Sequence, residues 1–250
     1  MRNAISGSFR QISTILMFLV PLLTSMVIMI EFVDPVIRSY HENSNFVKGF
    51  HFEYLAKGFQ SDQLSSFLPF LAALPFASCF IDDLKSKFVR SLLIRSNYCT
   101  YLASRIVAGF LAGGLTILSG ALIAWGTAAI VLVPLEREIK DMEFITIDGL
   151  IEICFLLFLN GGLWAVLGMT MSTVMESKYI AYCSPFIVYY LLVILYERYF
   201  PNAWLLYPKN WLDPEIWPYG IGGAALFLLE LTFLCSLVFY VRGKRRLQQL

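Results

Sequence analysis

The residues best suited to do chemistry in this chain are polar side chains set inside long apolar runs. Glu230 lies in the middle of the run 221–241, and Asn160 lies in the middle of the run 150–171. A carboxylate at the centre of a bilayer is costly, so it normally faces protein, water or a partner. Two interpretations stay open. In the first, Glu230 and Asn160 line a substrate path or a dimer seam. In the second, Glu230 is a protonated acid that is hydrogen-bonded to another helix through Asn160.

Other catalytic patterns are missing from the sequence. It contains no GxxxxGK[ST] stretch and no HExxH stretch, so we expect neither a nucleotide-binding loop nor a zinc-protease site. The two histidines, His41 and His51, share one polar loop, and the five cysteines are scattered without a CxxC pair. We therefore expect no metal site and no catalytic residues, and the chain by itself is not an enzyme.

The elements that position these side chains are predicted to be membrane-spanning helices. Apolar residues make up 58% of the 250 residues and charged residues 15%, against about 45–50% and about 25% in soluble domains. The apolar residues gather in runs long enough to cross about 30 Å of hydrocarbon. We predict an all-α membrane protein with one transmembrane domain (1–250) and six spans, at about 12–30, 64–81, 98–133, 150–171, 179–196 and 221–241.

Two polar segments between the spans have distinct compositions. Residues 82–97 are basic and amphipathic. Residues 197–219 contain four prolines together with Trp204, Trp211 and Trp217, which is too broken for a span and too aromatic for a free loop. We predict interfacial or re-entrant structure there. The three tryptophans either anchor the chain at the membrane interface or form an external gate.

The distribution of positive charge predicts the orientation. With six spans, twelve of the nineteen Lys and Arg residues fall on the side that holds both termini and residues 82–97, and the other seven lie in longer loops. The positive-inside rule places the more basic side in the cytoplasm. We therefore predict a multi-pass plasma-membrane protein with both termini cytoplasmic. The net charge of +1 gives no indication of nucleic-acid binding, and we expect no nucleic-acid partner.

The segment 82–97 is predicted to be a cytoplasmic amphipathic helix. Leu84, Phe88 and Val89 fall on one arc of a helical wheel, while Lys87 and Arg90 fall opposite. One interpretation is a basic helix that only anchors the loop to anionic lipid. The other is a docking surface for a soluble partner. Its candidate residues are Asp83, Lys85, Lys87, Phe88, Arg90, Leu92 and Arg95.

A family resemblance favours docking. The stretch 67–76 (FLPFLAALPF), followed by 80–84 (FIDDL), 92–95 (LLIR) and Tyr101, resembles the second span, coupling helix and third span of ABC type-2 exporter permeases. The predicted six spans and the aromatic segment before the last span are also similar to that family, which includes type V exporters. The resemblance implies a dimer of identical or homologous permease subunits, each resting its coupling helix on a soluble P-loop ATPase. ATP and magnesium would be bound by the ATPase, and this chain would carry no cofactor.

The expected function is therefore the permease subunit of an ATP-driven exporter embedded in the lipid bilayer. The first alternative is a membrane scaffold or immunity-type protein with no transport. The second is an intramembrane enzyme, which the lack of paired catalytic residues disfavours. The sequence does not distinguish a peptide, lipid, drug or glycan substrate.

Overall fold

The chain is helical in every regular element that the structure describes. The computed structural model describes residues 14–41, 50–85, 89, 97–135, 147–175 and 177–248, and these ranges contain no strand. The α-helices are α2 (Thr14–His41), α3 (Phe50–Phe59), α4 (Asp62–Ala73), α5 (Cys79–Lys85), α7 (Tyr98–Leu132), α8 (Ile147–Met175), α9 (Lys178–Ile194) and α10 (Gly220–Gln248). The short helical turns are η1 (Val133–Leu135), η2 (Leu195–Tyr199), η3 (Trp204–Leu206), η4 (Pro208–Leu212) and η5 (Pro214–Ile216). The all-α prediction is confirmed.

Four helices of the described chain are long and apolar enough to cross a membrane. They are α7, α8, α9 with its extension η2, and α10. Helix α2 is longer than the predicted first span, and the part of it whose side chains the structure describes, Leu16–Ile30, is apolar but shorter than a full span. Four candidate spans are thus present, and the count of six stays a prediction.

The predicted second span is divided into two helices. Helix α4 ends at Ala73, turns follow, and α5 starts at Cys79. Pro75 lies in the turns, and because proline has no N–H it removes the backbone hydrogen bond that would continue α4. Pro69 is accommodated inside α4. The region therefore has no single helix long enough to be counted as a span.

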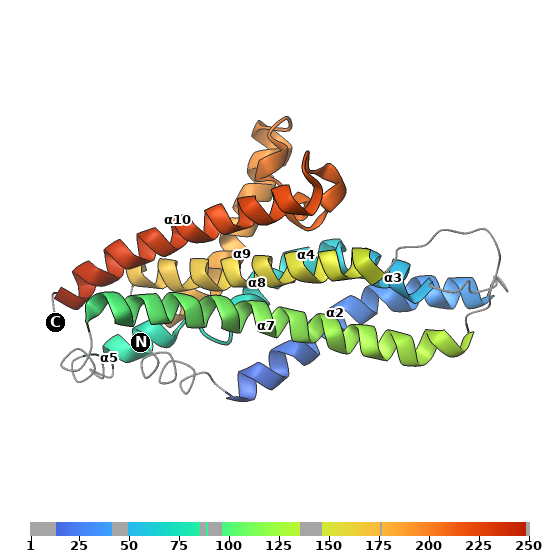
Figure 1. Cartoon of the computed structure of the whole chain (residues 1–250), viewed down its shortest axis with the longest axis horizontal. Helices are drawn as coiled ribbons and strands as arrows, with labels where there is room; N and C mark the ends of the chain where they lie inside the picture. The colour runs from blue at the N-terminus through green and yellow to red at the C-terminus, as the bar shows by residue number, and fades with distance from the viewer. Residues whose placement is uncertain are drawn as a thin grey trace.

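Helix α8 is the central helix of the bundle. It is apolar on all sides, and 67% of its membrane-length window is buried, against 22% for α9 and for α10. Helices α7, α10, α9 and α4 all pack against it. Figure 1 shows α7 and α8 side by side along the long axis, with α10 crossing the bundle on the other side of α8. A helix apolar all round is expected at such a buried position.

Glycines set the separation of α7 and α8. A Cβ added at Gly113 would lie 2.5 Å from the Cβ of Ala165 and 2.6 Å from the carbonyl oxygen of Gly161. A Cβ at Gly161 would in turn lie 2.9 Å from the carbonyl oxygen of Gly113. The two backbones are therefore in direct contact, as small residues permit in membrane helix pairs.

Exposed aromatic residues mark the length of the outer helices. On α9 and η2, Tyr179 and Tyr199 are 81% and 68% exposed. They are about 20 residues apart, or about 30 Å at the helical rise, which matches the thickness of a bilayer's hydrocarbon core. Tyr219, the residue before α10, and Arg242 within it bracket a similar length. Tyrosines at both ends are typical of the aromatic belts of membrane helices.

Candidate coupling site at the basic end of the bundle

One end of the bundle gathers the segments that flank the predicted coupling helix. The end of α5, the start of α7 and the end of α10 lie together at the left of Figure 1. Phe80 on α5 contacts Phe239 on α10 with ring centroids 5.0 Å apart, and both belong to an apolar cluster with Tyr101, Leu102 and Leu247. We call this the basic end, because it carries Lys85 and the cations of the last turns of α10.

A buried ion pair joins α5 to α7 at the basic end. The Arg105 guanidinium pairs with Oδ2 of Asp83, and both side chains are only 2% exposed. The Tyr101 hydroxyl donates a hydrogen bond of 2.6 Å to the same oxygen. Tyr101 and Arg105 are one helical turn apart on α7, so both can reach one carboxylate. The Arg105 guanidinium also lies 5.9 Å from the ring of Phe76 and 5.3 Å from that of Tyr101.

A second, more exposed set of contacts joins α5 to α9. Lys178, the first residue of α9, pairs with Asp82, and their side chains are 47% and 43% exposed. The Ser78 hydroxyl donates to Asp82 at 3.2 Å, and the Tyr182 hydroxyl donates to Ser78 at 2.8 Å. Adjacent aspartates of α5 thus point to different helices, Asp83 to α7 and Asp82 to α9. A displacement of α5 would be transmitted to both.

The predicted docking residues separate into three groups. Lys85 is exposed at the end of α5. Asp83 is buried in its pair with Arg105, so in this arrangement its carboxylate is not available to a docking partner. The remaining five, Lys87, Phe88, Arg90, Leu92 and Arg95, lie outside the described residues.

The apolar arc predicted for 82–97 faces the protein where it is described. Val89 is fully buried and packs in the cluster of Phe80, Tyr101 and Phe239, and Leu84 packs against the same cluster. Helix α7 then begins at Tyr98 after Asn97, which has an extended backbone, as the sequence predicts. The predicted coupling segment is therefore held by packing at Val89 and by the ion pairs of α5.

The structure does not bring Glu230 and Asn160 together. Asn160 is buried on α8 beside Gly161, and its Oδ1 has no hydrogen-bond partner among the described residues. Glu230 is exposed on α10. The polar contact between α8 and α10 is a different one, a hydrogen bond of 3.1 Å from the Thr170 hydroxyl to the carbonyl of Cys235. Sequence reasoning did not single out Thr170.

The predicted gate tryptophans form a packed cap, in which the short turns before α10 lie against α8 and α10. Trp211 is 3% exposed and stacks on Trp164 of α8, with ring centroids 5.7 Å apart and an interplanar angle of 20°. Trp217 is 8% exposed and meets Trp204 edge to face at 4.8 Å. The three tryptophans belong to one packed cluster, and both of their proposed roles, membrane anchor and external gate, stay predictions.

Hydrogen bonds from the indoles fix the cap's short helical turns. The Nε1 of Trp211 donates to the Leu205 carbonyl at 2.9 Å, and the Nε1 of Trp217 donates to the Asn210 carbonyl at 2.8 Å.

An ion pair joins the cap to α4. Lys209 pairs with Asp62 at the start of α4. Partial burial lowers the pKa of Lys209, but hydrogen bonds to Asp62 and Tyr207 outweigh it and hold the pKa above its usual value.

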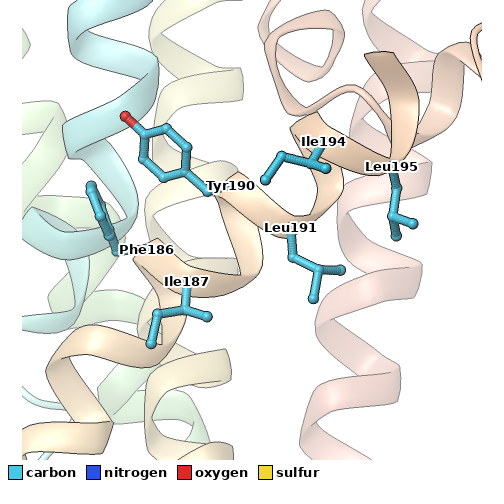
Figure 2. Close-up of a pocket in the computed structure, with 6 residues that line it drawn as sticks. All are labelled: Phe186, Ile187, Tyr190, Leu191, Ile194 and Leu195. Atoms are coloured by element: carbon cyan, nitrogen blue, oxygen red, sulfur yellow. The ribbon is translucent and has the colours of Figure 1, made fainter. Parts of the chain in front are cut away.

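A shallow groove runs along α9. It has a volume of about 400 Å³ and is lined by Phe186, Ile187, Tyr190, Leu191, Ile194 and Leu195 (Figure 2). The lining side chains are apolar apart from the hydroxyl of Tyr190, and no ionisable carboxylate or amine lines it. Acyl chains of lipid can fill such a surface without leaving a polar group unsatisfied.

The Asp83–Arg105 pair was missed from the sequence because its partners are on different helices. Arg105 is counted there only as one of the positive charges of the basic side. The available signal was the spacing of Tyr101 and Arg105 one turn apart, just after a segment that begins with two aspartates. The described residues contain no group of three or more His, Cys, Asp or Glu side chains that could hold a metal ion.

Comparisons of the chain with protein-family models, with curated proteins and with solved structures found no match.

Proposed function

We propose that this chain is the transmembrane permease subunit of an ATP-driven exporter of the ABC type-2 kind. It would lie in the plasma membrane with the basic end in the cytoplasm. A soluble P-loop ATPase would dock at that end and bind ATP and magnesium. Two permease subunits would enclose the substrate path between them.

The attachment of α5 is the observation that carries the proposal. Helix α5 contains the first four residues of the predicted coupling segment, 82–85, and Asp83 and Asp82 connect it to α7 and α9. A force applied by an ATPase to 82–97 would thus reach two candidate membrane helices through ion pairs. A helix that only rests on lipid would have no need of such links.

The charges of the described chain support the proposed orientation. Lys85, Lys178 and the cations of the last turns of α10 are all near the basic end, while Lys209 pairs with Asp62 at the start of α4. Clusters of Lys and Arg next to membrane helices are typical of cytoplasmic sides.

Charge reversal in the coupling segment tests the proposal. We expect Lys87→Glu and Arg90→Glu combined with Phe88→Ala to lower the amount of ATPase that co-purifies with the chain by about tenfold, because charged residues orient docking and an apolar anchor holds it. The amount is measured by quantitative mass spectrometry of the affinity-purified full chain.

The matched control is Arg242→Glu with Lys244→Glu on α10. It reverses two exposed charges at the same end of the molecule without touching the coupling segment. We expect this control to retain the ATPase. Equal recovery with both variants would contradict docking at 82–97 and would favour a lipid-anchoring helix.

A further inference from the structure

Helix α10 exposes a carboxylate at the middle of its candidate span. Glu230 is exposed, and it lies about 11 residues after Tyr219 and about 12 residues before Arg242. These separations correspond to about 16 Å and about 18 Å along the helix. In a hydrocarbon layer about 30 Å thick, Glu230 therefore lies near mid-depth.

The Glu230 side chain points away from its own bundle. Leu228 and Phe239, both fully buried, lie on the opposite side of α10 by helical geometry. In the part of the chain that the structure describes, no hydrogen bond or ion pair involves the side chain of Glu230. A carboxyl group at this depth and with this direction needs a polar partner from outside the described residues, because lipid offers none.

The other outward faces have no comparable requirement. The exposed described residues of the apolar part of α2, such as Phe18 and Leu22, are apolar. Those of α7 beyond its first turn, such as Leu122 and Ile130, include no ionisable side chain. The groove on α9 is also free of charge (Figure 2). Glu152 on α8 is also exposed, but it lies near the start of its candidate span, where a carboxylate can reach the headgroup region. Lipid can cover these faces, so the mid-depth position of Glu230 distinguishes α10 as the face that needs protein.

We propose that the exposed face of α10 packs against the same face of a second copy of this chain. We call this face the α10 seam, and its residues recur at helical spacing: Gly222, Leu226, Glu230, Phe233, Leu237 and Val241. Gly222 has open space around it, which allows close approach of another helix near that end.

Membrane geometry makes the α10 seam self-complementary. Two identical chains with the same orientation are related by a twofold axis along the membrane normal, so each residue meets its own copy at the same depth. Glu230 then lies opposite Glu230, with apolar residues above and below. Two such carboxyl groups hydrogen-bond to each other when they share a proton, because two negative charges at that distance repel.

This inference deepens the proposed function and rests on its requirement for two permease halves. It identifies the second half as another copy of this chain and names the surface between them. The tests of the two proposals are separate, since one measures recovery of an ATPase and the other measures contact between two copies of α10.

Disulfide cross-linking in native membranes tests the α10 seam. In a variant whose five native cysteines are replaced by alanine, we expect Leu226→Cys and Phe233→Cys to give covalent homodimers under mild oxidation. Phe18→Cys on α2 and Leu122→Cys on α7 are controls, because both sites are exposed but lie on other helices. Cross-linking at the α10 positions no greater than at the controls would overturn the proposal.

A second measurement keeps the native cysteines. Two differently tagged full-length copies are expressed together, and the fraction that co-purifies is compared between variants. We expect Glu230→Leu to lower this fraction by about fivefold, since an interhelical hydrogen bond is lost. Glu230→Gln should retain it, because an amide both donates and accepts.

An unchanged dimer fraction in Glu230→Leu would overturn the proposal, as would cross-links from α10 to a different protein. If the α10 positions fail to cross-link while the chain still recovers an ATPase, the seam is wrong and the proposed function stands. If the seam forms but no ATPase is recovered, the proposed function fails and the seam stands.

Discussion

Among the charged residues that the structure describes, Asp83 has the clearest structural role. Its carboxylate accepts from Tyr101 and pairs with Arg105 in a buried site, whereas neighbouring Asp82 makes an exposed pair with Lys178. Removing one partner of a buried pair is far more costly than removing one partner of an exposed pair. Substitutions of the two adjacent aspartates therefore compare the stability contributed by a buried pair with that contributed by an exposed pair.

We expect Asp83→Asn to destabilise the protein by about 3–5 kcal/mol, because the Arg105 charge stays buried without its carboxylate. Asp82→Asn should cost about 1 kcal/mol or less. The double variant Asp83→Asn with Arg105→Met should recover part of the loss, since the buried charge is also removed. Thermal unfolding in detergent measures all three. A Tm for Asp83→Asn no lower than that for Asp82→Asn would show that the ion pair does not hold α5 to α7.

At the scale of single residues, the sequence identified the polar residues in apolar helices but not the residues that they contact. It singled out Glu230 and Asn160 as polar residues in apolar helices, but no hydrogen bond joins them in the structure. It placed Asp83 on a docking surface, whereas the structure buries it. Both outcomes depend on which faces of α5, α8 and α10 meet, and a residue pattern along one chain does not contain that information.

Among the helices, the contact between α7 and α8 depends most closely on residue size. Gly113 and Gly161 allow the two backbones to touch, and the atoms nearest to an added Cβ at Gly113 include the Gly161 carbonyl oxygen. A backbone atom cannot move aside as a flexible side chain can, so a larger residue must separate the helices.

We expect Gly113→Ala to lower stability by about 1–3 kcal/mol through overpacking. The control is Gly126→Ala on the same helix, where an added Cβ meets nothing within 4 Å. Alanine favours helix there by about 1 kcal/mol, so the control should be neutral or stabilising. Tm values from thermal unfolding in detergent compare the two. Equal effects would mean that the α7–α8 contact is looser than the structure indicates.

Helix ends were predictable where local signals are strong. The start of α7 at Tyr98 follows Asn97, and the start of α10 at Gly220 follows a proline-rich segment, close to the predicted bounds. The split between α4 and α5 was not predicted, although Pro75 was visible. The cap was predicted as broken aromatic structure, but its burial depends on stacking of Trp211 on Trp164, a contact between distant segments.

Over the described molecule, the basic end and the tryptophan cap differ in chemistry. The basic end combines cations with ion pairs that connect α5 to α7 and α9, while the cap that precedes α10 holds buried tryptophans. Under the proposed function, energy would enter at the basic end and the cap would close the external side. The α10 seam would join two such molecules in the plane of the membrane.

The most direct measurement is to purify the tagged full-length chain from its native cells in a mild detergent and to identify what accompanies it. We expect a soluble P-loop ATPase in a one-to-one ratio with the chain and ATP hydrolysis by the purified complex. A folded chain that is recovered without any ATP-hydrolysing subunit would contradict this expectation.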